Sequence, residues 1–270
     1  MREFKAPIGF LTIAQNTTTD YLNLAYEQAK NIKATQRNNK YAVIVDANTL
    51  EKVTDEHRMV FDYIIELPID LSKDKTWKLD NEWQIMNLTP FKETIKLESD
   101  LLFTTDISHW LDALRLRDIC FSYNCRDHQN QLVTKTAYRK LFKLNDLPDI
   151  YNGMMYFRYS QTAVDFFRLA KDIYANWGIV SKEIIQCDQT PTTDVVYAIA
   201  AKILGVEKCL IPTLDFFNFV HMKPNVQGWD DRQPWTELVN VEHDGAMIRI
   251  NNVNQYHPVH YYEKDFINND

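Results

Sequence analysis

The stretch TIKLESDLLFTTDISHW (residues 94–110) decides how the whole chain is interpreted. Its first half is typical of a buried β-strand, yet two acids, Glu98 and Asp100, lie within it, separated by one residue. An unpaired carboxylate is costly to bury, so both side chains need partners. A bound cation would supply one, and so would the N–H groups of a neighbouring helix or of a backbone turn.

Apolar segments earlier in the chain predict the rest of a sheet. PIGFLTIAQN (7–16), KYAVIVDANT (40–49) and MVFDYIIELPID (59–70) are expected to contain strands, and residues 17–35 have the spacing of a helix capped by Thr18 or Thr19. Alternating strands and helices indicate an α/β fold with a mostly parallel sheet covered by helices. Ligands of such sheets bind beyond the carboxyl ends of the strands. The polar groups after Ile13, after Val45 and around Asp100 should therefore meet at one edge.

The second half of the chain is less regular. Residues 161–177 and 192–205 predict two amphipathic helices, the second ended by Gly205. Only 6 Gly and 9 Pro occur among 270 residues, and no linker or repeat is visible. We therefore expect one domain that spans residues 1–270.

Composition limits the function classes. No targeting or membrane-spanning segment is visible, and the four cysteines form no C-x-x-C pair, which together favour a soluble protein of the cytoplasm. A net charge of −7 argues against a surface that binds nucleic acid everywhere. A negative net charge is still compatible with a local basic patch.

The acids themselves suggest a metal site. Residues i and i+2 of a strand point to the same face, so Glu98 and Asp100 can approach one ion. Carboxylate oxygens suit Mg²⁺ or Mn²⁺, and such an ion can neutralise a pyrophosphate. The alternative is that the two acids cap a helix or bond to a turn.

The order of several motifs resembles the GT-A-fold glycosyltransferases, in particular the retaining galactosyltransferase and glycogenin type. IKLESDLLFTTDISHW resembles their acidic Asp-x-Asp strand, and DIYNGMMYF (149–157) resembles the strand that approaches the donor sugar. TTDVVYAIAAKIL (192–204), LIPTLDFFNF (210–219) and HPVHYYEKDF (257–266) follow in the family's order. The resemblance implies a GT-A-like domain, with residues 1–110 binding the nucleotide and residues 111–270 binding the acceptor.

The chain departs from the family pattern in three places. Glu98 replaces the first Asp, no Ser separates Asn152 from Gly153, and two segments resemble the late His…Lys element. Position in the chain favours His260 with Lys264, whereas the pattern of neighbouring residues favours His221 with Lys223.

The resemblance implies roles for individual residues. The metal ligands would be Asp100, Glu98, and His260 or His221. The catalytic candidates are Asp194 and Asn152, although Asp194 could equally be an acid that caps its helix. For Gly153, the alternative to sugar binding is a turn glycine. The nucleotide sugar, expected to be UDP-linked, would be bound by Ala14, Gln15, Asn16, Tyr21, Asp46, Lys96, Gly153, Lys264 and Lys223.

The acceptor is suggested by residues 134–145. Lys135, Tyr138, Arg139 and Lys140 alternate positive charge with an aromatic ring, as a nucleic-acid track would, or as a solvated helix face would. DNEWQIMNLTPFKETIKLESDLLF (80–103) also resembles glycosyltransferase-like proteins of tailed bacteriophages. That resemblance implies glucosyl or arabinosyl transfer to 5-hydroxymethylcytosine in double-stranded phage DNA, within the host cytoplasm. A glycan or protein acceptor, a metal-dependent phosphohydrolase or nuclease, and a non-catalytic nucleotide-binding module remain alternatives.

Overall fold

The computed structural model describes residues 2–75, 78–123, 125–130, 132, 139–185, 190–209, 217–222, 240–243 and 247–261. A six-stranded sheet in the order β3-β2-β1-β4-β7-β6 forms its centre. The first four strands in this order run parallel, and β7 is antiparallel to both β4 and β6. The central strands are β1 (Ala6–Ala14), β2 (Tyr41–Val45), β3 (Tyr63–Glu66), β4 (Phe91–Leu97), β6 (Ile119–Tyr123) and β7 (Ile150–Arg158).

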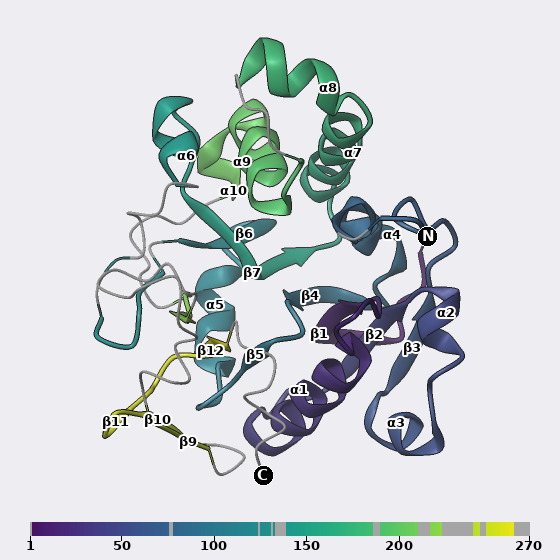
Figure 1. Ribbon diagram of the computed structural model, residues 1–270, viewed down its shortest axis with the longest axis vertical. Coiled ribbons are helices and arrows are strands. Elements are labelled where there is room, and N and C mark those ends of the chain that lie inside the picture. Colours follow the sequence, from purple (N-terminus) through teal and green to yellow (C-terminus); the bar gives the residue numbers. More distant parts are fainter. Residues whose placement is uncertain are drawn as a thin grey trace.

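Helices cover both faces of this sheet, with α1 on one side and α7 and α9 on the other (Figure 1). The apolar stripe of α1 packs on Ile95 and Leu97, whereas α7 and α9 pack around Met155. The α-helices are α1 (Tyr21–Thr35), α2 (Ala47–Leu50), α3 (Asp55–Val60), α4 (Ile85–Leu88), α5 (Leu111–Leu114), α6 (Lys140–Leu144), α7 (Gln161–Ala175), α8 (Trp177–Ile179), α9 (Thr193–Leu204) and α10 (Val206–Cys209). Two 3₁₀ helices, η1 (Leu79–Gln84) and η2 (Ser108–Trp110), and a π-helical segment, η3 (Val180–Ile184), complete the set.

Two small sheets accompany the central one, and buried residues of both belong to one apolar cluster. The first has the order β5-β12-β8, with β12 antiparallel to β5 and parallel to β8. The second is an antiparallel sheet in the order β11-β10-β9. Their strands are β5 (Leu101–Leu102), β8 (Val220–Met222), β9 (Val241–His243), β10 (Ile248–Ile250), β11 (Val253–Asn254) and β12 (Val259–Tyr261).

The predicted α/β class and mostly parallel sheet are confirmed, and so is the end of α9 at Gly205, whose φ is 110°. Three local predictions were wrong. Asp20, rather than Thr18 or Thr19, caps α1 by accepting from Asn23 N at 3.1 Å. Residues 55–60 form helix α3, so the third strand is confined to β3. The fourth strand is also interrupted, because β4 ends at Leu97 and residues 101–102 join the sheet of β12.

Strand register brings the ends of the parallel strands together. Ala14 pairs with Val45, Val45 with Glu66, and Thr12 with Leu97, so β1 to β4 end at the same edge. The antiparallel β7 starts there, with Met154 opposite Leu97. Residues that follow the parallel strands therefore meet residues at the start of β7.

Candidate functional site

Three potential metal ligands converge where β4 ends. Glu98 and Asp100 lie in the turn between β4 and β5, and pairing of β5 with β12 places His260 opposite Leu101. His260 Nε2 lies 2.9 Å from Glu98 Oε2 and 3.2 Å from Asp100 Oδ1. One ligand atom from each of the three residues lies within 4.8 Å of the others. Asp100 and His260 are buried, whereas 37% of the Glu98 side chain is exposed, so the cluster is open on one side.

The electrostatics of this cluster favour a positive charge. Burial raises the pKa of Glu98, but contact with His260 outweighs it and brings the pKa to about 2. Burial lowers the pKa of His260, yet Asp100 and Glu98 together raise it. The two carboxylates thus stabilise a positive charge at this position. Two carboxylate oxygens and one imidazole nitrogen are also a donor set that fits Mn²⁺ or Mg²⁺.

The structure separates the two candidate histidines. His221 pairs with His260 across β8 and β12, and their rings stack at 5.1 Å with an interplanar angle of 18°. Rings of Phe219 and Tyr151 pack edge-on against His221 at 5.7 and 5.4 Å. His260 therefore faces the carboxylates, and His221 packs beside it among aromatic rings. The paired lysines, Lys223 and Lys264, lie outside the described residues.

A buried network of hydrogen bonds organises the loop after β1. Gln15 Nε2 donates to Asp46 Oδ2 at 3.1 Å, and Gln15 Oε1 accepts from Asn81 Nδ2 at 3.0 Å. Asn81 also donates to Asp70 Oδ1 at 2.8 Å. The other oxygen of Asp46 caps α2 by accepting from Thr49 N at 2.8 Å. Sequence reasoning missed Asp70 and Asn81, because nothing in the local pattern distinguishes them from surface residues.

The remaining nucleotide candidates lie beside this network. Asn16 N donates to Thr49 Oγ1 at 2.9 Å, and its side-chain oxygen accepts from Leu22 N at 2.8 Å. Ala14 is fully buried at the end of β1, and Tyr21 is half-buried at the start of α1. The loop that carries these residues is thus tied to both α1 and α2.

Lys96 is fully buried in β4 and forms an ion pair on the sheet. Its Nζ lies 3.1 Å from Glu82 Oε2 and donates to Asn152 O at 3.4 Å. Burial raises the pKa of Glu82, and the charge of Lys96 opposes that rise. The Asn152 side chain is also buried beside Glu82, and its amide makes no hydrogen bond of good geometry. Glu82 was another residue that the sequence did not single out.

Gly153 has a packing role. A Cβ at this position would lie 2.6 Å from Cζ of Phe219, so the ring occupies the space of a side chain. The carbonyl of Gly153 accepts from Glu98 N at 2.9 Å. The Phe219 ring thus leaves no room for a side chain at this position, which explains the glycine by packing within the protein.

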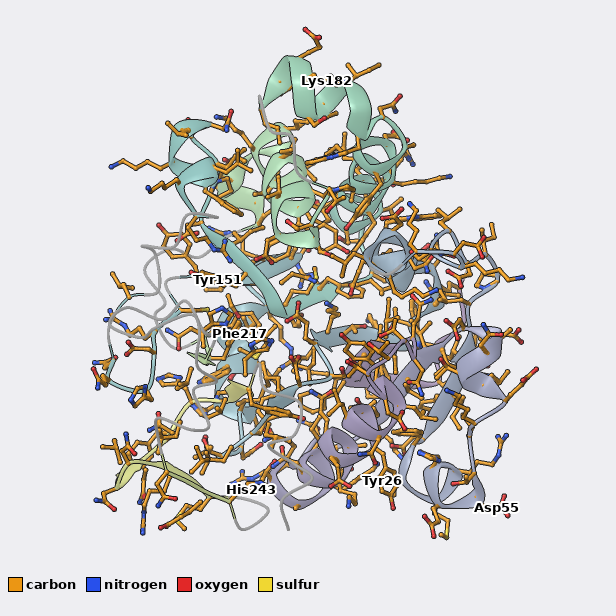
Figure 2. All side chains as sticks on the ribbon, in the orientation of Figure 1. Tyr26, Asp55, Tyr151, Lys182, Phe217 and His243 are labelled. Atoms are coloured by element: carbon orange, nitrogen blue, oxygen red, sulfur yellow. The ribbon has the colours of Figure 1, made fainter. Side chains whose placement is uncertain are left out.

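Asp194 is held by two partners within the protein. Its Oδ2 accepts from Arg139 Nη2 at 2.7 Å, and its Oδ1 accepts from Asn152 N at 2.8 Å. Arg139 also pairs with Asp149 and lies over the ring of Tyr151, 3.5 Å from its centroid. In Figure 2 Tyr151 lies near the middle of the molecule, below the helical layer that carries Lys182.

These contacts decide how the predicted acceptor residues lie. Arg139 is 6% exposed, so its guanidinium faces the interior rather than an outer phosphate track. Lys140 is exposed at the start of α6. Lys135 and Tyr138 lie outside the described residues.

Comparison with solved structures identifies the architecture. The chain superposes on the WbbM bifunctional glycosyltransferase with a TM-score of 0.50 and 12% identity, over 84% of this chain and 42% of WbbM. The chain has a glycosyltransferase-like fold. This confirms the GT-A-like class predicted from the sequence.

Two further glycosyltransferase structures are similar. Mouse xyloside xylosyltransferase 1 has a TM-score of 0.49 and 10% identity, over 76% of this chain and 84% of that one. The mannosyltransferase Ktr4p from S. cerevisiae has a TM-score of 0.48 and 12% identity, over 78% and 69%. No protein-family model and no curated protein matches the sequence. Within the described ranges, no helix is long and apolar enough to cross a membrane.

Proposed function

We propose that this protein is a divalent-metal-dependent glycosyltransferase that moves a sugar from a nucleotide diphosphate sugar, UDP-linked, to a hydroxyl group. The observation that carries the proposal is the convergence of Glu98, Asp100 and His260 within a glycosyltransferase-like fold. The cluster lies at the carboxyl edge of the sheet, where ligands of α/β proteins bind.

The three side chains would hold Mn²⁺ or Mg²⁺. A cation bound there supplies positive charge to the diphosphate as it leaves. Asp100 and His260 are buried and therefore well positioned, while the partly exposed Glu98 borders the side that a donor can reach. His221 supports the ring of His260 by stacking.

The rest of the edge would bind the donor. The network around Gln15 and Asp46 fixes the loop after β1, so a nucleotide meets a preformed surface that includes Asn16 and Tyr21. Preformed polar groups lose little conformational entropy when they bind. The positive charge of Lys96 lies near the end of β4, two residues before Glu98. Lys264 or Lys223 would contact the phosphates.

The sugar would lie against Asn152, at the start of β7. The amide of Asn152 is buried without a well-aligned partner, which is expensive unless a ligand satisfies it. Both oxygens of Asp194 accept hydrogen bonds within the protein. We therefore assign Asp194 the task of fixing the start of β7, where Asn152 and Gly153 lie.

The acceptor we propose to test first is 5-hydroxymethylcytosine in DNA. Its hydroxymethyl group projects into the major groove, so the base can be reached without being flipped out. Support comes from the basic residues 135–140, of which Lys140 is exposed. Arg139 forms ion pairs with Asp149 and Asp194, so its charge does not face a DNA phosphate. Glycan and protein acceptors are therefore tested as well.

The decisive experiment measures nucleotide release from a panel of nucleotide sugars with Mn²⁺. It compares wild type with Asp100→Asn and with Asp112→Asn, a control in which the altered side chain is 97% exposed. Each protein is assayed with hydroxymethylcytosine DNA, with unmodified DNA, and with glycan and protein acceptors.

We expect release to require metal and to persist in Asp112→Asn. In Asp100→Asn it should fall roughly a hundredfold or more, as when one group that stabilises the transition-state charge is removed. That result would support the transferase. Stimulation by hydroxymethylcytosine DNA alone would identify the acceptor. Hydrolysis of phosphodiesters without sugar transfer would instead support a phosphohydrolase. Binding without any turnover would support a non-catalytic module.

A further inference from the structure

The turn that carries both acids is held by the side chain of one helical residue. Gln28, on α1, donates from Nε2 to Glu98 O at 2.7 Å and to Leu101 O at 2.7 Å. Its side chain is fully buried. One amide nitrogen thus bridges the two ends of the turn that presents Glu98 and Asp100.

The orientation of this amide is fixed. Both atoms that it faces in the turn are carbonyl oxygens, which accept only, so the nitrogen must be the atom that faces them. Its Oε1 accepts from the hydroxyl of Tyr41, a buried residue of β2, at 2.8 Å. Tyr41 and Gln28 therefore form a continuous connection from the central sheet to the turn.

This connection meets the chain where the strand is interrupted. After Leu97 the carbonyl of Glu98 bonds to Gln28, and Glu98 N bonds to the carbonyl of Gly153. The chain then turns and enters the sheet of β12, where Tyr261 N donates to Asp100 O at 3.0 Å. Contacts from α1, β7 and β12 thus fix the acidic turn together, which sets where the two carboxylates lie relative to His260.

We propose that Gln28 is a positioning residue for the metal site, one that sets the affinity for the divalent cation without touching it. The inference rests on the proposed function, since it assumes that Glu98, Asp100 and His260 bind a cation. Groups that orient metal ligands through hydrogen bonds typically change metal affinity about 10–100-fold when they are removed.

The same helix offers a matched control. Asn31, one turn further along α1, donates to Phe103 O at 2.9 Å and accepts from Phe103 N at 2.7 Å. It is also buried and also bonds to the backbone of the segment after β4. Phe103, however, is not one of the three candidate metal ligands. Loss of Asn31 should therefore lower the stability of the fold and leave the metal affinity unchanged.

The experiment compares Mn²⁺ affinity, measured by the EPR signal of free Mn²⁺, for wild type, Gln28→Met, Tyr41→Phe and Asn31→Leu. Gln28→Met and Asn31→Leu both remove the amide and keep a side chain of similar length. Each protein is also unfolded thermally, so that loss of affinity can be compared with loss of stability. Tyr41→Phe removes only the hydroxyl that orients Gln28. This variant tests the inference if Gln28→Met does not fold.

We expect about tenfold or greater weakening in Gln28→Met, a smaller change of the same sign in Tyr41→Phe, and an affinity within twofold of wild type in Asn31→Leu. Unchanged affinity in both Gln28→Met and Tyr41→Phe would overturn the inference, and so would an equal loss in Asn31→Leu. A wild type that binds no Mn²⁺ would overturn the metal site itself, and the inference with it. The two failures are thus distinguishable.

Discussion

Arg139 Nη2 lies 2.7 Å from Asp194 Oδ2, and this ion pair joins the start of α6 to the start of α9 beside the start of β7. Both side chains are largely buried, at 5% and 17% exposure. Since the second oxygen of Asp194 binds Asn152 N, the pair controls the backbone from which the proposed sugar contacts arise. The guanidinium also pairs with Asp149 and covers Tyr151, so this one residue balances two carboxylates.

Replacing Arg139 with Met should destabilise the protein by about 3 to 5 kcal/mol, because it leaves two largely buried carboxylates without their cation. Urea denaturation measures the change. Lys202→Met is the control, since its pair with Asp146 is exposed and worth less than about 1 kcal/mol. If Arg139→Met and Lys202→Met lowered the free energy of unfolding by the same small amount, the buried ion pair would not stabilise the fold.

Substitution of the two histidines should separate their roles. His260→Gln removes a nitrogen that faces both acids, so we expect Mn²⁺ binding to weaken roughly tenfold or more. His221→Gln removes a stacked ring and should mainly lower the melting temperature. Titration of Mn²⁺ into each variant gives the answer, and a larger loss of affinity in His221→Gln would reverse our assignment.

Gly153→Ala should be poorly tolerated. The new Cβ would meet the Phe219 ring at 2.6 Å, and overpacking of this kind costs about 1 to 3 kcal/mol. Gly178→Ala is the control, because its added Cβ would meet no atom within 4 Å apart from its chain neighbours and the backbone of its own helix. Thermal unfolding of both variants, and of Gly153→Ala with Phe219→Leu, tests the cause. A double variant no more stable than Gly153→Ala would show that the ring is not responsible.

Asp62 should make stability depend on acid pH. Burial raises the pKa of this carboxyl, but hydrogen bonds from Lys33, Lys40 and Tyr41 N lower it below its usual value overall. The stabilisation is therefore present at neutral pH and is lost as the pH falls through the lowered pKa of the folded state.

Accordingly, Asp62→Asn should lower stability by roughly 1 kcal/mol at pH 7, a modest value because solvent screens the two lysines. The difference from wild type should shrink below the ordinary pKa of aspartate, about 3.9. Denaturation between pH 7 and pH 3 checks the sign. A difference that stayed constant over this range would exclude the charge as its source.

Much of the fold could be predicted because its signals are local. Apolar runs such as residues 41–45 can only be buried strands or helix cores, and the spacing in residues 192–204 fits a helix ended by Gly205. The position of Glu98 and Asp100 at the carboxyl edge also followed from the strand that precedes them. The chemistry of a carboxylate pair next to that edge then suggested a divalent cation.

The sequence by itself therefore determined the α/β class and the location of the acids, because hydrophobic periodicity and strand direction are properties of short segments. Only the tertiary structure decided that His260 rather than His221 faces the acids, and that Arg139 is buried. Those outcomes depend on the register of β12 with β5 and on ion pairs between residues distant in the chain. The break at Glu98 likewise depends on Gln28, 70 positions away, whose hydrogen bonds compensate for the strand pairing that the turn gives up.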